Sequence, residues 1–220
     1  MKNKTSAPDV SAPETSAPAE GLRTEIRRNQ ILDAASRCFC DYGFHGASIS
    51  RISQQAGMSA GHIYHYFENK EAIIGAIVQR DLDRLVELWA ELRASQDVRE
   101  SVIELSAGKV EEMTDSFSAG LRLEIIAEAA RNPEVARIVQ AANNCCMENL
   151  IEILRLARQA GGMNDDDEIL AAKGEIIASM FEGLMVRTVR NPTIDRKRMA
   201  GMMQHVMRRI ISSEDWNGLV

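Results

Sequence analysis

Side chains able to bind nucleic acid are concentrated between residues 48 and 65. Hydroxyl groups and the N–H groups at a helix start bind phosphate, and an imidazole hydrogen-bonds a purine edge or a phosphate. The stretch offers serine hydroxyls, two histidines and a tyrosine, and its glycine lets the backbone approach base edges closely. The residues that we expect to contact DNA here are Ser48, Ser50, Ser59, Ala60, Gly61, His62, Tyr64 and His65.

Two short helices joined by a glycine turn are predicted to position these side chains. Ser48 is suited to cap a first helix that buries Ile52, because its hydroxyl can accept from the free N–H groups there. Gly57 supplies a left-handed turn, and Ser59 caps a second helix over residues 60–67. Such a pair of helices places one exposed helix in a DNA major groove.

The chain beyond Pro18 is predicted to be helical throughout. No proline occurs between Pro18 and Pro133, apolar residues recur at helical spacing, and no stretch alternates with a period of two. In the first long helix, Phe39 and Tyr42 share an expected buried stripe. The predicted fold is all-α, with further helices at residues 25–42, 69–92, 98–114, 119–130, 133–160, 166–190 and 196–213.

Composition divides the chain into three parts. Residues 1–21 contain three Ser-Ala-Pro repeats, which cannot bury a core, so we expect a disordered arm. Residues 22–70 form the expected three-helix helix-turn-helix domain, and residues 71–220 a larger helical bundle. Residues 22–80 carry a net charge of +2 and residues 81–220 one of −7, within a total of −6. A mildly basic DNA reader on an acidic body fits this distribution.

Composition also argues against a membrane protein and an enzyme. No apolar run reaches the ~18 residues that cross a bilayer, and residues 1–20 lack the apolar stretch of a signal peptide. Four cysteines without a framework spacing fit free thiols in a reducing cytoplasm. Phosphate loops, nucleophile elbows and zinc motifs do not occur, so we expect no catalysis, no cofactor and no membrane partner.

Three groups of residues between Arg27 and Ile77 carry a family resemblance. They are Ile31-Leu32-Asp33-Ala34-Ala35 with Phe39 and Gly43, then Ser50-Arg51-Ile52 with Ala56-Gly57-Met58, and finally Ile63-Tyr64-His65-Tyr66-Phe67-Glu68-Asn69-Lys70-Glu71. In this order and at these spacings they resemble the tetracycline-repressor (TetR) family of bacterial transcriptional regulators. Beyond Gln79 the likeness is only one of helix number and length.

The resemblance implies a homodimeric repressor that binds a palindromic double-stranded DNA operator and is released by a small-molecule effector. It also implies that Lys70 contacts a phosphate, and that residues 71–220 bind the effector and form the dimer. The two reader helices of such a dimer would lie about 34–36 Å apart, one turn of DNA. The expected pocket residues, for which plain core packing is the alternative, are Leu85, Trp89, Met113, Phe117, Met147 and Phe181.

Two apolar stripes near the C-terminus are candidates for the dimer interface. Small residues on one helix allow close helix approach, and a stripe of larger apolar residues on the next could complete a four-helix interface, the architecture that the resemblance implies. The alternative is that both stripes belong to the core of a single chain. The candidate interface residues are Ala171, Gly174, Ala178, Met199, Met203, Val206 and Ile210.

Several other patterns have a functional and a structural interpretation. His62 and His65 could ligate a metal ion together with His45, but we expect no metal site there. For Cys145 and Cys146 we expect buried thiols, because a disulfide between neighbouring residues is strained. For the acidic run at residues 165–168 we expect helix capping and not a cation site. A DNA-binding architectural protein without a ligand is the alternative to a regulator.

Overall fold

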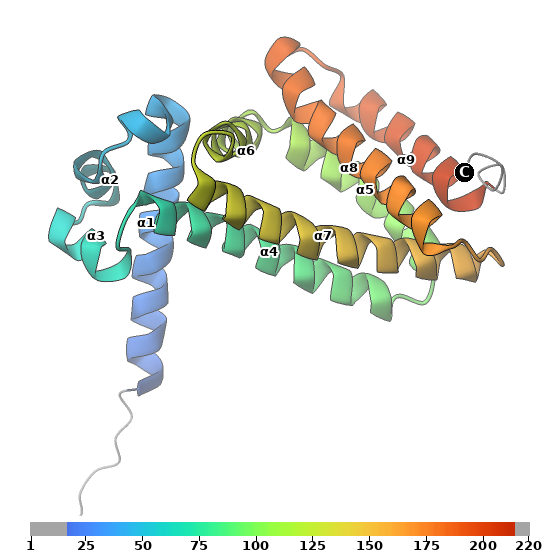
Figure 1. Ribbon diagram of the computed structural model, residues 1–220, viewed down its shortest axis with the longest axis horizontal. Helices are drawn as coiled ribbons and strands as arrows, with labels where there is room; N and C mark the ends of the chain where they lie inside the picture. Colours follow the sequence, from blue (N-terminus) through green and yellow to red (C-terminus); the bar gives the residue numbers. More distant parts are fainter. Residues whose placement is uncertain (1–16, 214–220) are drawn as a thin grey trace, which may run out of the picture.

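The molecule has a small helical head and an elongated helical body (Figure 1). The computed structural model describes residues 17–213, and within this range it contains helices and no strand, so the all-α prediction is confirmed. None of the helices in this range is long and apolar enough to cross a membrane. The helices are α1 (Ala17–Gly46), α2 (Ile49–Ala56), α3 (Ala60–Tyr66), α4 (Lys70–Ala94), α5 (Val98–Thr114), α6 (Ser116–Ala129), α7 (Pro133–Ala160), α8 (Asp167–Arg190) and α9 (Arg196–Ser212).

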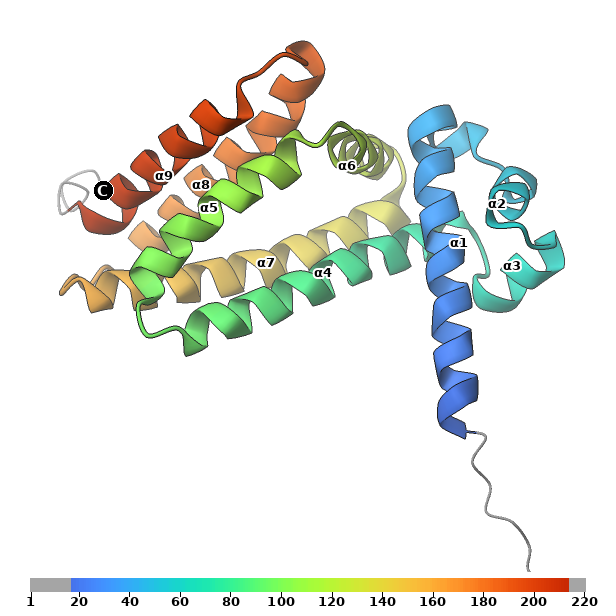
Figure 2. The same ribbon diagram turned by 180° about the vertical axis from the view of Figure 1, so that it is seen from behind.

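Helix α4 connects the two parts. It starts in the head, enters the body and packs along α7, and Figures 1 and 2 show these two helices side by side from both directions. Helix α6 lies crosswise between α1 and the remaining helices of the body (Figure 2), and it packs on α1, α7 and α8. The head therefore touches the body through α4 and α6.

Short polar residues set the starts of most helices. Each accepts a hydrogen bond from a backbone N–H in the first turn, which satisfies a donor that the helix leaves free. The capping residues, in chain order, are Ser48, Ser59, Asn69, Asp97, Asp115, Asn132, Asp166 and Asp195. The capping interpretation of the acidic run is thus confirmed for Asp166.

Helix α1 differs from its prediction at both ends. It begins at Ala17, so the expected arm through residue 21 is too long by five residues, and residues 1–16 of that arm lie outside the described range. Gly43 has φ +68° and interrupts the helix as expected, but one further turn follows to Gly46. A Cβ at Gly43 would also lie 3.2 Å from Oε1 of Glu124, so both the backbone and its surroundings favour glycine.

The core of the head extends into the body. Ile31, Phe39, Ile52 and Ile63 are fully buried together, but the same cluster includes Ile77 of α4 and residues 121, 125 and 135 of α6 and α7. The expected boundary at residue 70 therefore marks the start of α4 and does not divide the core. A second cluster around Trp89, Val110, Leu154 and Ile177 fills the body.

A buried ion cluster stabilises the end of the body away from the head. Asp165, just before α8, contacts both Arg158 of α7 and Lys173 of α8, and all three side chains are almost fully buried. Arg158 Nη1 also donates to the carbonyls of Ile210 and Ile211 at 3.0 Å, which caps the end of α9. This cluster joins α7, α8 and α9.

Candidate nucleic-acid interface

The α2–turn–α3 unit has the geometry expected of a helix-turn-helix. Gly57 adopts φ +64° and its N–H donates to the carbonyl of Gln54, while the N–H of Met58 donates to that of Ser53 at 2.9 Å. These bonds close α2 and turn the chain into α3. The hydroxyl of Ser59 accepts from the N–H of His62 at 3.2 Å, which leaves its own hydrogen available to a phosphate.

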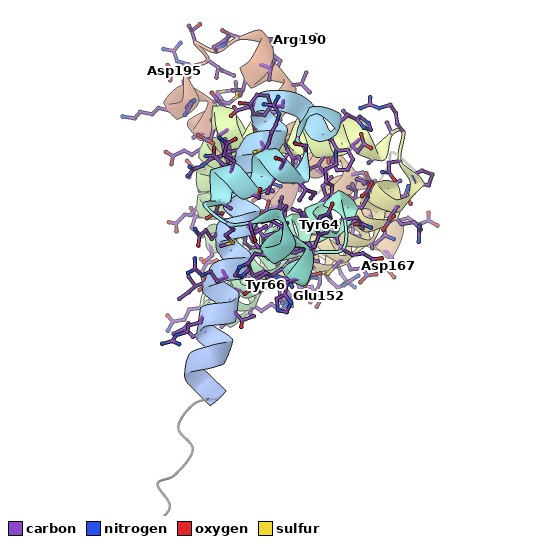
Figure 3. All side chains as sticks on the ribbon, turned by 90° about the vertical axis from the view of Figure 1, so that its left-hand side faces the viewer. Tyr64, Tyr66, Glu152, Asp167, Arg190 and Asp195 are labelled. Carbon is purple, nitrogen blue, oxygen red and sulfur yellow. The ribbon has the colours of Figure 1, made fainter. Side chains whose placement is uncertain are left out.

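Helix α3 turns one face inward and one outward. Ile63 and Phe67 are buried in the head, as expected. Figure 3 views the head from the side of α2 and α3, with Tyr64 and Tyr66 toward the viewer. Tyr64 is 57% exposed, so its hydroxyl is accessible on the outward face of α3. The predicted contact residues of this region are all exposed, namely Ser48, Ser50, Ser59, Ala60, Gly61, His62, Tyr64 and His65.

Tyr66 orients both histidines of α3. The ring of His62 stacks on that of Tyr66 with centroids 5.5 Å apart, and His65 meets the same ring edge-on at 5.2 Å. Stacking restricts the rotamers of both imidazoles, so less entropy is lost when they bind a fixed surface. Tyr66 is therefore a supporting residue that presents His62 and His65.

Tyr42 and Arg51 form a further exposed pair beside α2. The guanidinium of Arg51 lies 4.4 Å from the centroid of the Tyr42 ring, and Tyr42 is 53% exposed. The expectation that Tyr42 lies in the buried stripe is wrong, because Phe39 and Phe44 fill the core at this end of α1 and the Tyr42 ring lies outside it. The pair places an oriented cation next to the capped start of α2.

Lys70 is held at the junction of head and body. Its Nζ donates to the carbonyl of Phe44 at 2.6 Å and lies 4.3 Å from the centroid of the Phe44 ring. An ammonium has three hydrogens, so one such bond leaves others for a phosphate. The phosphate contact expected of Lys70 therefore stays a prediction.

The head also presents several exposed cations. The side chains of Arg23, Arg27, Arg28, Arg37 and Arg51 are all exposed. Arg28 lies over the Phe67 ring at 5.0 Å from its centroid, so its charge is held near α3. Among residues 17–213 no three His, Cys, Asp or Glu side chains gather as a metal site needs.

The body contains an apolar cavity of about 340 Å³ that is partly open to solvent and is lined by α4 to α9. Five of the six expected pocket residues line it: Leu85, Trp89, Met113, Met147 and Phe181. The placement of Phe117 is corrected, because it is 46% exposed at the start of α6 and its carbonyl accepts from the Cys40 thiol. Phe117 lies in the first turn of α6, where this helix packs on α1, so its side chain lies at the junction of head and body and not in the interior of the bundle.

The stripes expected at the dimer interface lie partly inside the subunit. Gly174 is buried, and a Cβ there would lie 2.9 Å from Cε of Met147. Ala178 lines the apolar cavity, and Ala171 is half-buried. On α9, Met203 and Ile210 are buried, and Met199 and Val206 pack against them. Gly174, Met203 and Ile210 therefore belong to the core of the subunit, because a small residue lets α8 approach α7 and the larger ones fill the body. A role of the half-buried Ala171, Ala178, Met199 and Val206 in a dimer stays a prediction.

The free thiols sit in apolar or acidic surroundings. Burial, then Asp41 and Glu124, raise the pKa of the Cys40 thiol to about 11, and burial raises that of Cys146, which lines the cavity. Thiols with raised pKa react slowly. Cys145 and Cys146 are free and half-buried, and Cys146 packs against the core of the body. That neither thiol serves as a redox sensor stays a prediction.

Comparison with known families gives two matches along the chain. The family described as bacterial regulatory proteins, tetR family, matches residues 31–77, which span the second half of α1 to the start of α4. A second, described as BetI-type transcriptional repressor, C-terminal, matches residues 111–212 of the body. The first match covers the reader helix, and the second covers most of the cavity-forming helices.

Individual proteins resemble the chain over most of their length. The transcriptional regulator UidR of Escherichia coli K12 is 31% identical over 154 residues, which cover 67% of this chain and 75% of UidR. The transcriptional repressor Rv1474c of Mycobacterium tuberculosis is 30% identical over 186 residues, 82% of this chain and 90% of Rv1474c. The regulator FadR of Bacillus subtilis, solved with stearoyl-CoA, shares the fold with a TM-score of 0.68 at 21% identity, covering 81% of this chain and 96% of FadR.

Proposed function

The chain belongs to the tetR family of bacterial regulatory proteins, and from this premise we propose that it represses transcription in the cytoplasm as an operator-bound dimer that a small molecule releases. The observation that carries the proposal is the outward face of α3. Its histidines and Tyr64 are exposed while Ile63 and Phe67 anchor the helix in the head. An exposed helix with polar side chains and a glycine fits the major groove.

A different face of α8 and α9 supports the dimer. Ile176, Val186, Val189 and Met202 are all exposed apolar residues in these two consecutive helices. On α8, Ile176 and Val186 share one helical face with Gly183, where a Cβ would meet nothing within 4 Å. Contiguous exposed apolar residues mark a protein interface, and a symmetric dimer buries the same face of both copies.

The cavity supports release by a small molecule. A concave, mainly apolar site of this size with a few polar groups is the usual form of a ligand pocket, and FadR, which has the same fold, was solved with stearoyl-CoA. Ile125 and Ile126 of α6 line the cavity, while Glu124 and Glu128 of the same helix contact the head at Phe44 and His45.

This arrangement gives the effector a route to DNA. A ligand that displaces α6 or α4 moves the head, and with it the spacing of the two reader helices in a dimer. The effector and the operator then oppose each other by reciprocal coupling, so DNA weakens effector binding by the same factor.

Selection of bound fragments from the genome of the host organism tests the proposal. The full-length protein should enrich one or a few sites with two-fold symmetry, and His205→Ala, an exposed histidine on α9, should enrich the same sites. Extracts or compounds that release the protein from those sites then identify effectors. Enrichment without symmetry, or no release by any compound that binds the body, would favour an architectural DNA-binding protein.

A further inference from the structure

A second, polar chamber lies next to the apolar cavity, at the junction of head and body. Its volume is about 300 Å³, and α1, α4, the end of α5 and the start of α6 contribute to it. Four guanidinium groups line it, those of Arg37, Arg80, Arg84 and Arg122, against three carboxylates. The charged lining of the chamber therefore has one excess positive charge.

The two spaces share part of their lining. Asp81 of α4 and Arg122 of α6 line both the polar chamber and the apolar cavity. Their side chains form an ion pair at 3.5 Å, and Arg122 also contacts Glu112, which Lys109 holds at 2.9 Å. A molecule that fills the apolar cavity would meet the Arg122 guanidinium at one end.

The carboxylates of the chamber are already paired. Asp33 accepts from Arg80 at 2.8 Å, Asp81 lies between Arg84 and Arg122, and Glu112 contacts Lys109 and Arg122. Burial alone would raise the pKa of Glu112, but Lys109 and then Arg122 hold it below its ordinary value. A cationic ligand would have to break these pairs.

The guanidinium groups, in contrast, have donors to spare. A guanidinium carries five N–H groups, and the Nε of Arg80 is buried without an acceptor among the described residues. Arg37 is exposed and pairs with no carboxylate in that part of the chain. Buried donors without acceptors are rare in folded proteins and call for an acceptor. The spare donors suit an anionic group.

We propose that the effector is an amphipathic anion, whose apolar part occupies the cavity of the body and whose carboxylate or phosphate enters the polar chamber beside Arg122 and Arg80. This inference rests on the proposed release by a small molecule and adds its chemical class. Charge-assisted, paired N–H bonds from a guanidinium to either headgroup give geometric selectivity as well as affinity.

The headgroup would act directly on the contact between head and body. Arg80 belongs to α4, and its partner Asp33 belongs to α1, so their ion pair ties the reader domain to the long helix. An anion in the chamber competes with Asp33 for Arg80. The effector then weakens this tie only when its charged group is in place, so a neutral analogue binds less tightly and releases less DNA.

Fluorescence of Trp89, which lines the cavity, reports on binding. The only other tryptophan is Trp216, so the full-length Trp216→Phe variant leaves a single reporter, provided that it still binds operator. The probes are decanoate, decyl phosphate, 1-decanol and decyltrimethylammonium, which share one chain length and differ in headgroup. We expect one of the two anions to bind at least about tenfold more tightly than decanol, the ratio that one charge-assisted hydrogen bond supplies.

Two variants assign that preference to the chamber. Arg122→Gln should bring the anion down to the affinity of decanol, and Arg122→Lys should retain part of the difference. Arg208→Gln, which removes an exposed guanidinium on α9, is the control and should change nothing. Folding of each variant is checked by helical circular dichroism and operator binding. A preference for decanoate or for decyl phosphate distinguishes a carboxylate effector from a phosphate effector.

The outcomes separate this inference from the proposed function. Equal binding of anion and alcohol, tighter binding of the cation, an anion preference that survives in Arg122→Gln, or no binding of any probe would each overturn the anionic class. If decanol released the operator as well as decanoate does, the effector function would stand and only the charge requirement would fall. If anions bound through Arg122 without releasing the operator, the anion-binding site would be confirmed and its role in regulation would be contradicted.

Discussion

The carboxylate of Glu124 in α6 accepts a hydrogen bond from the backbone N–H of Phe44 in the last turn of α1, at 2.7 Å. The backbone carbonyl of Phe44 accepts a second hydrogen bond, from Nζ of Lys70 at 2.6 Å. The backbone of Phe44 is thus hydrogen-bonded both to the first turn of α4 and to α6, the helix that borders the effector cavity. A movement of α6 or α4 is therefore transmitted to the head through Phe44, in addition to the contacts at His45 and Asp33.

Glu124→Gln should weaken this contact. A hydrogen bond to a charged acceptor contributes about 1.5–3 kcal/mol, and the amide that replaces it keeps the shape but not the charge. We expect the free energy of unfolding in urea to fall by about 1 kcal/mol. The control Glu111→Gln, at an exposed position of α5, should leave the free energy of unfolding unchanged. Equal losses in Glu124→Gln and Glu111→Gln would contradict the role of Glu124.

Gly43→Ala and Gly57→Ala should differ in severity. Both glycines have positive φ, but Gly57 with ψ 33° is left-handed helical, where an alanine costs about 1–2 kcal/mol, whereas Gly43 with ψ 166° lies in a region that is essentially restricted to glycine. Gly57 has open space around its Cα, whereas an alanine Cβ at Gly43 would press on Glu124 at 3.2 Å. Gly43→Ala should therefore lower the unfolding free energy more, and it should also weaken coupling between effector and operator. A larger loss for Gly57→Ala would contradict the stronger constraint that the backbone and Glu124 place on Gly43.

Val186→Glu should produce monomers, because it places a charge in the apolar face proposed to pair in the dimer. Val86→Glu on α4 is the matched control, since the two valines have similar exposure, 40% and 43%. Light scattering should give half the mass for Val186→Glu and the dimer mass for Val86→Glu. A dimer that persists in Val186→Glu would place the interface elsewhere.

Asp165→Asn should strongly destabilise the body, by about 3–5 kcal/mol at pH 7, since it leaves the buried cations Arg158 and Lys173 facing each other. Burial alone raises the pKa of Asp165, but hydrogen bonds from Arg158 and Lys173 outweigh it and the pKa is lowered. A lowered folded pKa stabilises the protein fully above the unfolded value of about 4, and this contribution is lost as the pH falls below that value.

Urea unfolding from pH 7 to pH 3 measures this dependence. The wild type should lose stability below about pH 4 more steeply than Asp165→Asn, and Asp41→Asn, at an exposed site on α1, should behave like the wild type. If Asp165→Asn fails to fold, the double variant with Lys173→Met should recover part of the loss. Parallel pH curves for wild type and Asp165→Asn would contradict the account.

Local patterns made the head predictable. Ser48, Gly57 and Ser59 each act on their own few residues of chain, so their caps and turn follow from the sequence without knowledge of the remainder of the fold. Periodicity likewise places Ile63 and Phe67 inside and the histidines of α3 outside. Tyr42 escaped this reasoning because the break at Gly43 turns Phe44 into the core at this end of α1, and Tyr42 stays outside it.

Contacts between helices that are distant in the sequence could not be predicted from local sequence patterns. The stripe through Gly174 has the same appearance whether it faces α7 or a second subunit, and only the position of Met147 decides between them. Glu124 and Arg122 gave no signal either, since their roles depend on partners that lie far away in the sequence, at residues 44 and 81. A charged residue in an amphipathic helix is ordinarily expected to face solvent.

Operator affinity of the double variant His62→Ala/Tyr64→Ala tests the central claim most directly. Fluorescence anisotropy with a labelled operator fragment should show at least a thirtyfold loss, as expected for about 1 kcal/mol or more from each contact, with the fold and the dimer intact. His205→Ala should bind like the wild type. Unchanged affinity of the double variant would mean that α3 does not read DNA, and the account would be wrong.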